Sequence, residues 1–153
     1  MTDTPIAVSA GILWRGDLFL ACEKVRGPYK HYWEFPGGKL EPYESPREAL
    51  IRELQEELGI TVTEARFWQS IRHSYPEMSV IVHFFHVHAF LGEPRAQEGQ
   101  TIRWIHQAEA LALPFLEADT AIVHDIAAYR AAQTKGRIGG LIDGEHSVRN
   151  IHS

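Results

Sequence analysis

Apolar and polar positions near the start of the chain predict a β-hairpin. Residues 6–14 and 18–24 are two runs rich in aliphatic and aromatic side chains, and residues 15–17 read Arg-Gly-Asp between them. A short polar break that contains glycine is typical of the turn that joins two antiparallel strands. We therefore expect both runs to be strands that pair with each other.

A second, longer hairpin is predicted in the middle of the chain. Residues 61–74 and 79–91 are rich in β-branched and aromatic residues, and the break at residues 75–78 reads Tyr-Pro-Glu-Met. After a polar loop, a shorter apolar run at residues 101–105 predicts one more strand.

The segment between the two hairpins carries the start and stop signals of a helix. Ser45, Pro46 and Glu48 form a capping box with proline at the first helical position. Gly59 is a typical C-terminal stop. The helix is therefore predicted to begin at Pro46 and to end just before Gly59.

Helical periodicity returns near the end of the chain. Residues 107–113 and 120–132 carry helical patterns, whereas from Gln133 onward glycine, polar and charged residues dominate. We expect one folded domain over residues 1–132 and a tail over residues 133–153, flexible or docked on a partner subunit.

Composition and charge narrow the class of protein. Of the 153 residues, 44% are hydrophobic and 23% are charged, which suits one globular domain with an adequate core. The net charge of -5 argues against binding of polymeric nucleic acid, which needs a basic surface. Cys22 is the single cysteine, and the chain has no signal peptide and no apolar run of about eighteen residues. We expect a cytoplasmic protein that does not enter membranes.

Three glutamates of the predicted helix point to metal chemistry. Glu53, Glu56 and Glu57 have the i, i+3, i+4 spacing that places side chains on one helix face. Carboxylates gathered on one patch repel each other unless cations neutralise them. An all-oxygen ligand set suits Mg²⁺ or Mn²⁺ better than zinc. The alternative interpretation is a solvated acidic face, and the loop in front of the helix argues against it.

That loop is rich in glycine. Residues 33–39 read Trp-Glu-Phe-Pro-Gly-Gly-Lys, directly before the capped acidic helix. Paired glycines permit backbone conformations that other residues avoid, and they leave carbonyl oxygens free to approach a cation. We expect the carbonyl of Gly37 to be a further metal ligand.

One longer pattern joins the loop to the helix. Residues 38–60 fit G-x5-E-x7-R-E-U-x-E-E-x-G-U, with U an aliphatic residue, at every fixed position. This pattern is the Nudix box, and residues 5–130 resemble the MutT-type branch of the Nudix hydrolases. The resemblance implies an α+β fold in which a mixed β-sheet is sandwiched between helices. It also implies a Mg²⁺-dependent enzyme, with Mn²⁺ as a substitute, that hydrolyses nucleoside triphosphates to monophosphate and pyrophosphate and so sanitises the nucleotide pool in DNA repair.

The resemblance assigns roles to individual residues. The implied metal ligands are the carboxylates of Glu53, Glu56, Glu57 and Glu98 and the carbonyl of Gly37. Either Glu53 or Glu98 acts as the general base, Arg52 orients Glu53, and Glu44 supports the site from outside the ligand set. The implied substrate-binding residues are Lys24, Phe35, Gly38, Lys39, Tyr75 and Asp119.

Asp119 is the predicted reader of the nucleobase, because it stands where the bacterial relative carries an asparagine before its last helix. An ionised carboxylate accepts hydrogen bonds, so it suits the two adjacent donors of guanine. Cytosine requires that the carboxyl be protonated or engaged through one oxygen. The expected substrate is an 8-oxo-dGTP-like nucleotide, and CTP or 5-methyl-dCTP is the alternative substrate. Asp119 is also expected as the N-cap of a helix that starts at Thr120.

The residues expected to bind the phosphates differ from those of the bacterial relative. Glu23 occupies the place of an arginine that reaches the phosphates, and Lys24, Arg26 or Lys30 is expected to replace it. A Nudix hydrolase of ADP-ribose or dinucleoside polyphosphates is a further alternative, as is an inert nucleotide-sensing module. Inert modules usually have a damaged box, and this box is intact. The expected partner is a small nucleotide bound by a monomer or a homodimer.

Overall fold

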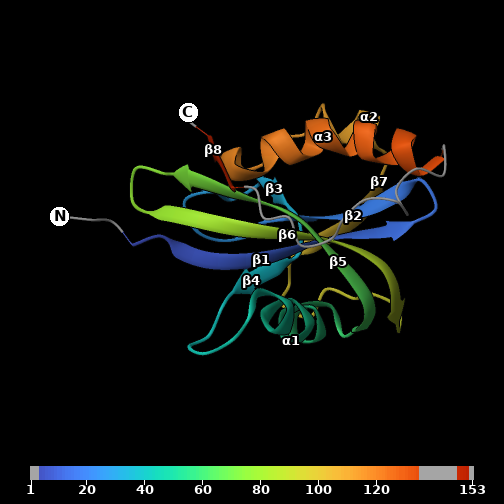
Figure 1. Cartoon of the computed structure of the whole chain (residues 1–153), viewed down its shortest axis with the longest axis horizontal. Coiled ribbons are helices and arrows are strands. Elements are labelled where there is room, and N and C mark those ends of the chain that lie inside the picture. Colours follow the sequence, from blue (N-terminus) through green and yellow to red (C-terminus); the bar gives the residue numbers. More distant parts are fainter. Residues whose placement is uncertain (1–3, 135–147, 152–153) are drawn as a thin grey trace.

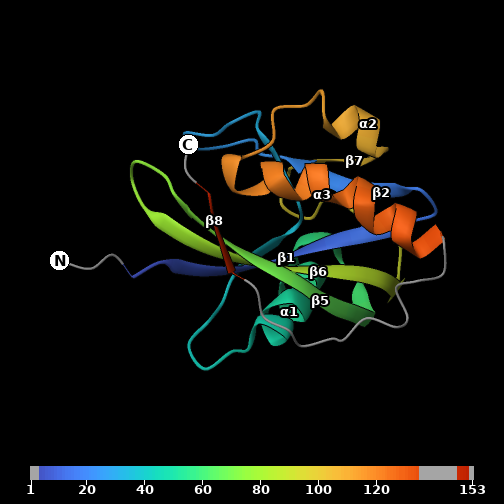
Figure 2. The same cartoon turned by 45° about the horizontal axis from the view of Figure 1, so that its top comes forward.

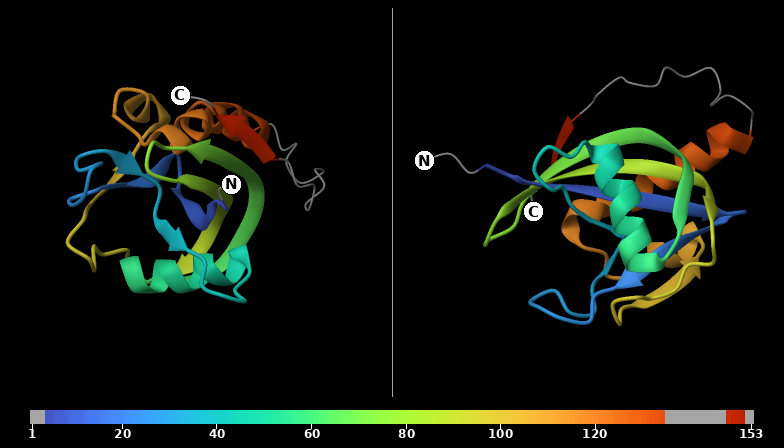
Figure 3. Two further views of the ribbon diagram at one scale, coloured as in Figure 1. Left: turned by 90° about the vertical axis from the view of Figure 1, so that its left-hand side faces the viewer. Right: turned by 90° about the horizontal axis from the view of Figure 1, so that it is seen from below.

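A mixed β-sheet lies between helices in the computed structural model, which describes residues 4–134 and 148–151. The elements in chain order are β1 (Ile6–Arg15), β2 (Leu18–Glu23), β3 (Trp33–Glu34), β4 (Gly37–Lys39), α1 (Pro46–Leu58), β5 (Thr61–Ser74), β6 (Ser79–Leu91), β7 (Thr101–Ile105), α2 (Gln107–Ala110), α3 (Glu117–Thr134) and β8 (Val148–Ile151). Helix α1 covers one face of the sheet, and α2 and α3 lie on the other (Figures 1 and 3). This arrangement confirms the predicted α+β sandwich.

The sheet joins the two predicted hairpins through a central parallel pair. Strands β1 and β2 pair antiparallel, as do β5 and β6, so both hairpins are confirmed. Strand β1 runs parallel to β6 and antiparallel to the short strand β4. The order is β3-β2-β1-β6-β5-β8, with β7 paired to β2. The glycine-rich segment is therefore fastened to the central strand of the sheet.

Alternating side chains of the sheet build an apolar core on each face. On one face, Leu50, Leu54 and Leu58 of α1 pack against the strands. On the other, Ile122 and Ile126 of α3 join a second cluster of buried aliphatic and aromatic residues. Each helix buries one apolar stripe, and the sheet is covered on both sides.

The ends of α1 match the sequence signals. The hydroxyl of Ser45 accepts from the Glu48 amide at 3.1 Å, while the Glu48 carboxylate accepts from the Ser45 amide at 2.9 Å. Pro46 occupies the first helical turn, and Gly59 takes the left-handed conformation with φ of 70°. The predicted capping box and stop are therefore both present, and they fix where the acidic helix begins and ends.

The C-terminal helices differ from the prediction at their ends. Helix α2 stops at Ala110, before the predicted residue 113, and the chain continues in turns in which the amides of Ala112 and Leu113 donate to the carbonyls of Glu109 and Ala110 at 3.0 and 3.1 Å. Helix α3 begins at Glu117 instead of Thr120. Asp119 therefore lies inside the first turn, and the predicted N-cap role for it is wrong.

Residues 33–39, predicted as a loop, contain two short strands. Strand β3 pairs with β2, and β4 pairs with β1 in a register that sets Gly37 opposite Ala10 and Gly38 opposite Ser9. Strands of two or three residues have too little pattern to be recognised in a sequence. Their pairing holds the glycines rigidly beside α1.

Part of the predicted tail returns to the sheet. Strand β8 pairs parallel with β5, where Ser70 lies opposite Val148 and His73 opposite Ile151 (Figure 2). Residues 135–147 and 152–153 of the predicted tail lie outside the described residues. Within residues 4–134 and 148–151, no helix is long and apolar enough to cross a membrane.

Candidate active site

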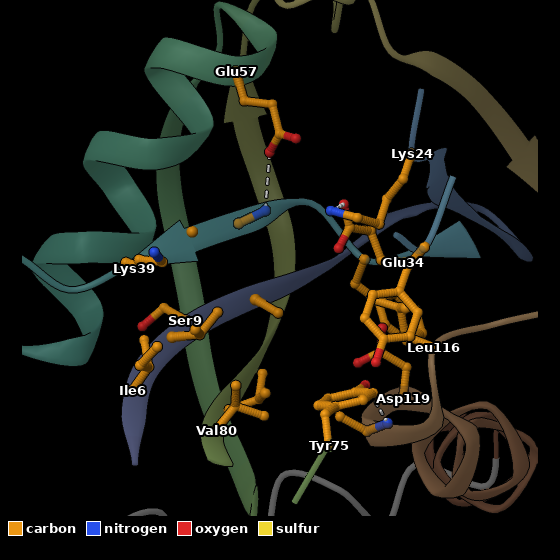
Figure 4. Close-up of a pocket in the computed structure, with 18 of the residues that line it drawn as sticks. Ile6, Ser9, Lys24, Glu34, Lys39, Glu57, Tyr75, Val80, Leu116 and Asp119 are labelled. Atoms are coloured by element: carbon orange, nitrogen blue, oxygen red, sulfur yellow. Dashed lines mark hydrogen bonds and ion pairs between the residues drawn. The ribbon is translucent and has the colours of Figure 1, made fainter. Parts of the chain in front are cut away.

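A pocket of about 380 Å³ opens between α1, strand β4 and the start of α3 (Figure 4). Glu57 of α1 stands at one end of it, and Tyr75 and Asp119 stand at the other. Apolar side chains of β1 and β6, among them Ile6 and Val80, line the floor between the two ends. The predicted metal box and the predicted base reader therefore share one cavity.

Arg52 organises the acidic residues at the outer side of the box. Its guanidinium donates to Glu44 at 2.7 and 2.9 Å, to Glu53 at 3.0 Å and to Glu56 at 3.3 Å. It also donates to the carbonyl of Lys39 at 2.9 Å. The hydrogen bonds from Arg52 lower the pKa of Glu44 to about 2. The contact expected between Arg52 and Glu53 is thus present, and Glu44 braces the arginine from the far side.

Glu57 lies deeper than the other box glutamates, with a relative exposure of 8%. Its carboxylate accepts a hydrogen bond from the Gly37 amide at 2.9 Å. Burial raises the pKa of Glu57 to about 8 against the opposing effect of that bond, and the charges of Glu34, Glu98 and Glu53 raise it further. A bound cation would relieve this unfavourable burial of negative charge.

Close packing requires glycine at position 37, and at position 38 a larger residue would displace the side chain of Glu53. A Cβ atom on Gly37 would overlap the backbone carbonyl of Ser9, and one on Gly38 would overlap the carboxylate of Glu53. The segment therefore passes directly against the helix and the central strand without side chains between them. These contacts with Ser9 and Glu53 account for the two glycines at the start of β4.

The predicted metal ligands are only partly gathered. Glu53 and Glu57 both contact β4, and Glu98 lines the same pocket from the loop after β6. Glu56 is 53% exposed and turned to Arg52. Within the described part of the chain, no three histidine, cysteine or acidic side chains form a group that could already hold a metal ion.

The chemistry of these donors fits a hard divalent cation. The groups available are carboxylate oxygens and backbone carbonyls, which Mg²⁺ and Mn²⁺ prefer. Burial also raises the pKa of Glu53, against the effect of Arg52. Glu57 has a neutral amide as its hydrogen-bond partner, and among the described residues it forms no ion pair. The buried carboxyl of Glu57 is therefore short of positive charge, whereas Glu53 is partly exposed and already paired with Arg52.

The other end of the pocket is built around Asp119, whose relative exposure is 5%. Burial raises the pKa of Asp119 well above its ordinary value, and the charge of Glu34 acts in the same direction. The backbone amide of Phe35 and the ammonium group of Lys24 oppose this shift. Tyr75 stands beside Asp119, and its hydroxyl accepts from the Ala118 amide at 3.0 Å.

Lys24 is the cation that reaches this end of the pocket. Its ammonium group lies 3.8 Å from the carboxylate of Glu34, and both side chains line the cavity. Glu23 instead contacts His31 at 3.0 Å, on the exposed side. Of the three expected replacements for the missing arginine, Lys24 lines the pocket, whereas Arg26 and Lys30 are not among the lining residues.

Two further predicted site residues, Phe35 and Lys39, also line the pocket. Phe35 lines the cavity but is only 4% exposed, so it belongs to the core as well. Lys39 lines the pocket near α1.

Glu34 also lines the pocket, but it was not predicted as a site residue. Burial raises the pKa of its carboxyl, which faces Lys24. A charged residue between Trp33 and Phe35 in an apolar stretch is the signal that identifies it.

Known proteins resemble this chain over most of its length. A model of the family described as NUDIX domain matches residues 3–126. A protein named CTP pyrophosphohydrolase from Escherichia coli (strain K12) is 39% identical over 129 residues, which cover 84% of this chain and 96% of that protein. An 8-oxo-dGTP diphosphatase from Haemophilus influenzae is 34% identical over 121 residues, covering 78% and 89%. A MutT structure from work on Aliivibrio salmonicida and Vibrio cholerae superimposes with a TM-score of 0.68 at 35% identity, covering 80% and 96%.

Proposed function

The chain belongs to the NUDIX family and is a pyrophosphohydrolase, and from this premise we propose that it hydrolyses cytosine nucleoside triphosphates with Mg²⁺. The products are a nucleoside monophosphate and pyrophosphate. Hydrolases of this family need a divalent metal ion. Mg²⁺ is proposed as that ion because the donors at the site are all oxygen atoms.

The protonation of Asp119 carries the choice of base. Burial raises the pKa of this carboxyl well above its ordinary value, which favours the protonated form of the group. A protonated carboxyl offers one donor and one acceptor side by side. The edge of cytosine presents the complement, since N3 accepts and the 4-amino group donates. The similarity to a relative named CTP pyrophosphohydrolase supports the same choice.

The box supplies the chemistry at the other end of the pocket. The metal would be held by Glu53, Glu56, Glu57 and Glu98 and by the carbonyl of Gly37. When bound, a divalent cation neutralises phosphate oxygens, activates a water molecule and stabilises the leaving group.

Residues of the chain then position the reactants. Arg52 orients Glu53, which accepts the proton of the attacking water, and Glu44 holds Arg52 in place. Lys24 lies on the pocket wall, where an ammonium group attracts the negatively charged nucleotide. Gly38 and Lys39 border the path of the phosphates between the two ends.

An 8-oxo-dGTP-like nucleotide is the second candidate. Its support is the relative named 8-oxo-dGTP diphosphatase, at 34% identity. Guanine offers two adjacent donors, so this substrate requires that Asp119 be ionised when the nucleotide binds. The two candidates therefore favour opposite protonation states of Asp119: the protonated carboxyl matches both groups of the cytosine edge, and the ionised carboxylate matches the two donors of guanine.

A nucleotide panel tests the proposal. The protein is incubated with Mg²⁺ and CTP, dCTP, 5-methyl-dCTP, dGTP or 8-oxo-dGTP, and the release of pyrophosphate is measured separately from that of orthophosphate. We expect pyrophosphate, with the highest kcat/KM for a cytosine nucleotide. Glu57→Gln is the control for the box and should lose activity on every substrate. Preference for 8-oxo-dGTP over all cytosine nucleotides would refute the choice of base.

Two substitutions separate the protonation states of Asp119. The side-chain amide of the Asp119→Asn variant also offers a donor beside an acceptor, so hydrolysis of the cytosine nucleotide should persist with a KM within about threefold of the original. Asp119→Ala removes both groups and should raise KM by roughly tenfold or more. Equal losses in the two variants would contradict reading by a protonated carboxyl.

A further inference from the structure

Two tyrosines from distant segments meet at the mouth of the pocket. Tyr29 comes from the loop between β2 and β3, and Tyr75 directly follows β5 in the turn of its hairpin. Their ring centroids lie 5.2 Å apart with an interplanar angle of 60°, and both side chains line the cavity. The hydroxyl of Tyr29 also donates to the carboxylate of Glu77 in the same turn at 2.5 Å.

The Tyr75 side of this contact is rigid. The turn is closed by hydrogen bonds in both directions between the backbones of Tyr75 and Met78, at 2.7 and 3.2 Å, and it contains Pro76. The ring of Tyr75 packs edge-on against His73 at 4.5 Å. Its hydroxyl is fixed on the amide of Ala118. Tyr75 is therefore a fixed wall of the pocket.

The Tyr29 side is carried by a loop with a narrow base. The amide of Lys24 donates to the carbonyl of Tyr32 at 2.9 Å, and the amide of His31 donates to the carbonyl of Lys24 at 2.8 Å. Gly27 and His31 both have left-handed backbone, with φ of 82° and 76°. The loop thus bends sharply on both sides of Tyr29, and the Glu77 bond fixes the outer end of its side chain.

The contact between the two rings lies next to Asp119, the residue proposed to read the nucleobase. Ala118, which holds the hydroxyl of Tyr75, directly precedes Asp119, and Tyr75 and Asp119 stand side by side in the pocket (Figure 4). A base whose edge faces Asp119 presents its flat faces to the neighbouring walls. Aromatic rings are the side chains that stack on such a face.

We propose that Tyr29 is a substrate-binding residue that forms, with Tyr75, an aromatic wall against which the nucleobase packs, and that Glu77 holds Tyr29 in place. This inference rests on the proposed function, because it assumes a nucleotide whose base lies at the Asp119 end. Tyr29 contributes to binding of the base, while Glu77 acts only through Tyr29 as a positioning residue.

Kinetics of four variants test this assignment, using the cytosine nucleotide of highest kcat/KM. Tyr29→Ala removes the ring and should raise KM at least fivefold, with kcat within about twofold of the original, since stacking on aromatic side chains contributes strongly to binding of bases. Tyr29→Phe and Glu77→Gln keep the ring and should raise KM by no more than about threefold. Tyr43→Ala is the control for removal of an aromatic ring, because Tyr43 is fully exposed and does not line the pocket.

Binding is measured in parallel by titration of each variant with the nucleoside monophosphate product, which needs no turnover. Weaker binding in Tyr29→Ala, alongside unchanged binding in Tyr43→Ala, supports the aromatic wall. If the unmodified protein turns over nucleotides but Tyr29→Ala keeps its KM, or if Tyr43→Ala loses as much, the role of Tyr29 is overturned and the proposed function stands. If the unmodified protein neither hydrolyses nor binds any nucleotide of the panel, the proposed function fails, and this inference fails with it.

Discussion

Replacement of Asp119 by asparagine is expected to stabilise the protein near neutral pH. Asp119 lies buried in the first turn of α3, and burial raises the pKa of its carboxyl well above the ordinary value of 3.8. In the unfolded chain the same carboxyl ionises freely at neutral pH. Because the folded carboxyl binds its proton more tightly than the unfolded one, folding takes up protons at Asp119 above a pH of about 4, and this uptake lowers the free energy of unfolding. Asparagine has a similar shape, offers a donor and an acceptor, and does not titrate.

The sign and size of the effect follow from proton linkage. Above a pH of about 4 the unfolded state binds fewer protons at this site than the folded state, so stability falls as the pH rises. The loss is about 1.4 kcal/mol per pH unit for as long as the folded carboxyl stays protonated. The stability of the original protein relative to Asp119→Asn should therefore fall as the pH rises above about 4, until the folded carboxyl itself ionises. Below a pH of about 4 both states hold the proton, and the difference should become constant.

Urea denaturation of both proteins across this pH range measures the difference. Other titrating groups are shared by the two proteins, so they cancel when one free energy of unfolding is subtracted from the other. Glu93→Gln is a control for the exchange of carboxyl for amide at an exposed site, where Glu93 pairs with Arg15. If the curves of stability against pH for the original protein and Asp119→Asn run parallel, Asp119 is ionised in the folded protein. That result would also remove the basis for reading cytosine.

Three further predictions concern the box. Glu53→Gln should reduce kcat by more than a factor of about 100, as expected for loss of a general base or metal ligand. A loss below about tenfold contradicts that role. Chelation of the metal by EDTA should likewise abolish activity until Mg²⁺ is added back. Gly38→Ala should reduce kcat/KM by roughly tenfold or more, because its Cβ would overlap the Glu53 carboxylate; unchanged kinetics would show that the strand can move aside. Ser45→Ala should lower the free energy of unfolding by about 1 kcal/mol through loss of the N-cap, and an unchanged urea midpoint would contradict the contribution of the cap.

The parts of the structure that sequence predicts well are those with local causes. The ends of α1 follow from Ser45, Pro46 and Gly59, which act within one turn of the helix. Both hairpins follow from apolar runs and the breaks between them. The box residues are predictable because their spacing on one helix fixes their relative positions, whatever the rest of the chain does.

The parts that the sequence conceals depend on distant contacts. Strand β3 exists because Trp33 and Glu34 pair with β2, and no pattern of two residues announces a strand. The early start of α3 changes Asp119 from an expected cap to a buried acid within the first turn. Its pKa depends on Glu34 and Lys24, which are more than eighty residues away in the sequence. Burial of this kind is a property of the assembled pocket.

The two ends of the pocket therefore differ in how the chain builds them. The proposed metal end draws most of its groups from residues 37–57, one continuous segment whose geometry is set by a capped helix and a paired strand. The proposed base end combines Lys24, Tyr75 and Asp119, which lie on separate elements and meet only through tertiary packing. Substitutions at the base end can consequently change the electrostatics and shape around the nucleobase without moving the box. Relatives of this chain are named for CTP and for 8-oxo-dGTP, and because of this separation we assign the choice between the two substrates to the protonation of Asp119 and not to any residue of the box.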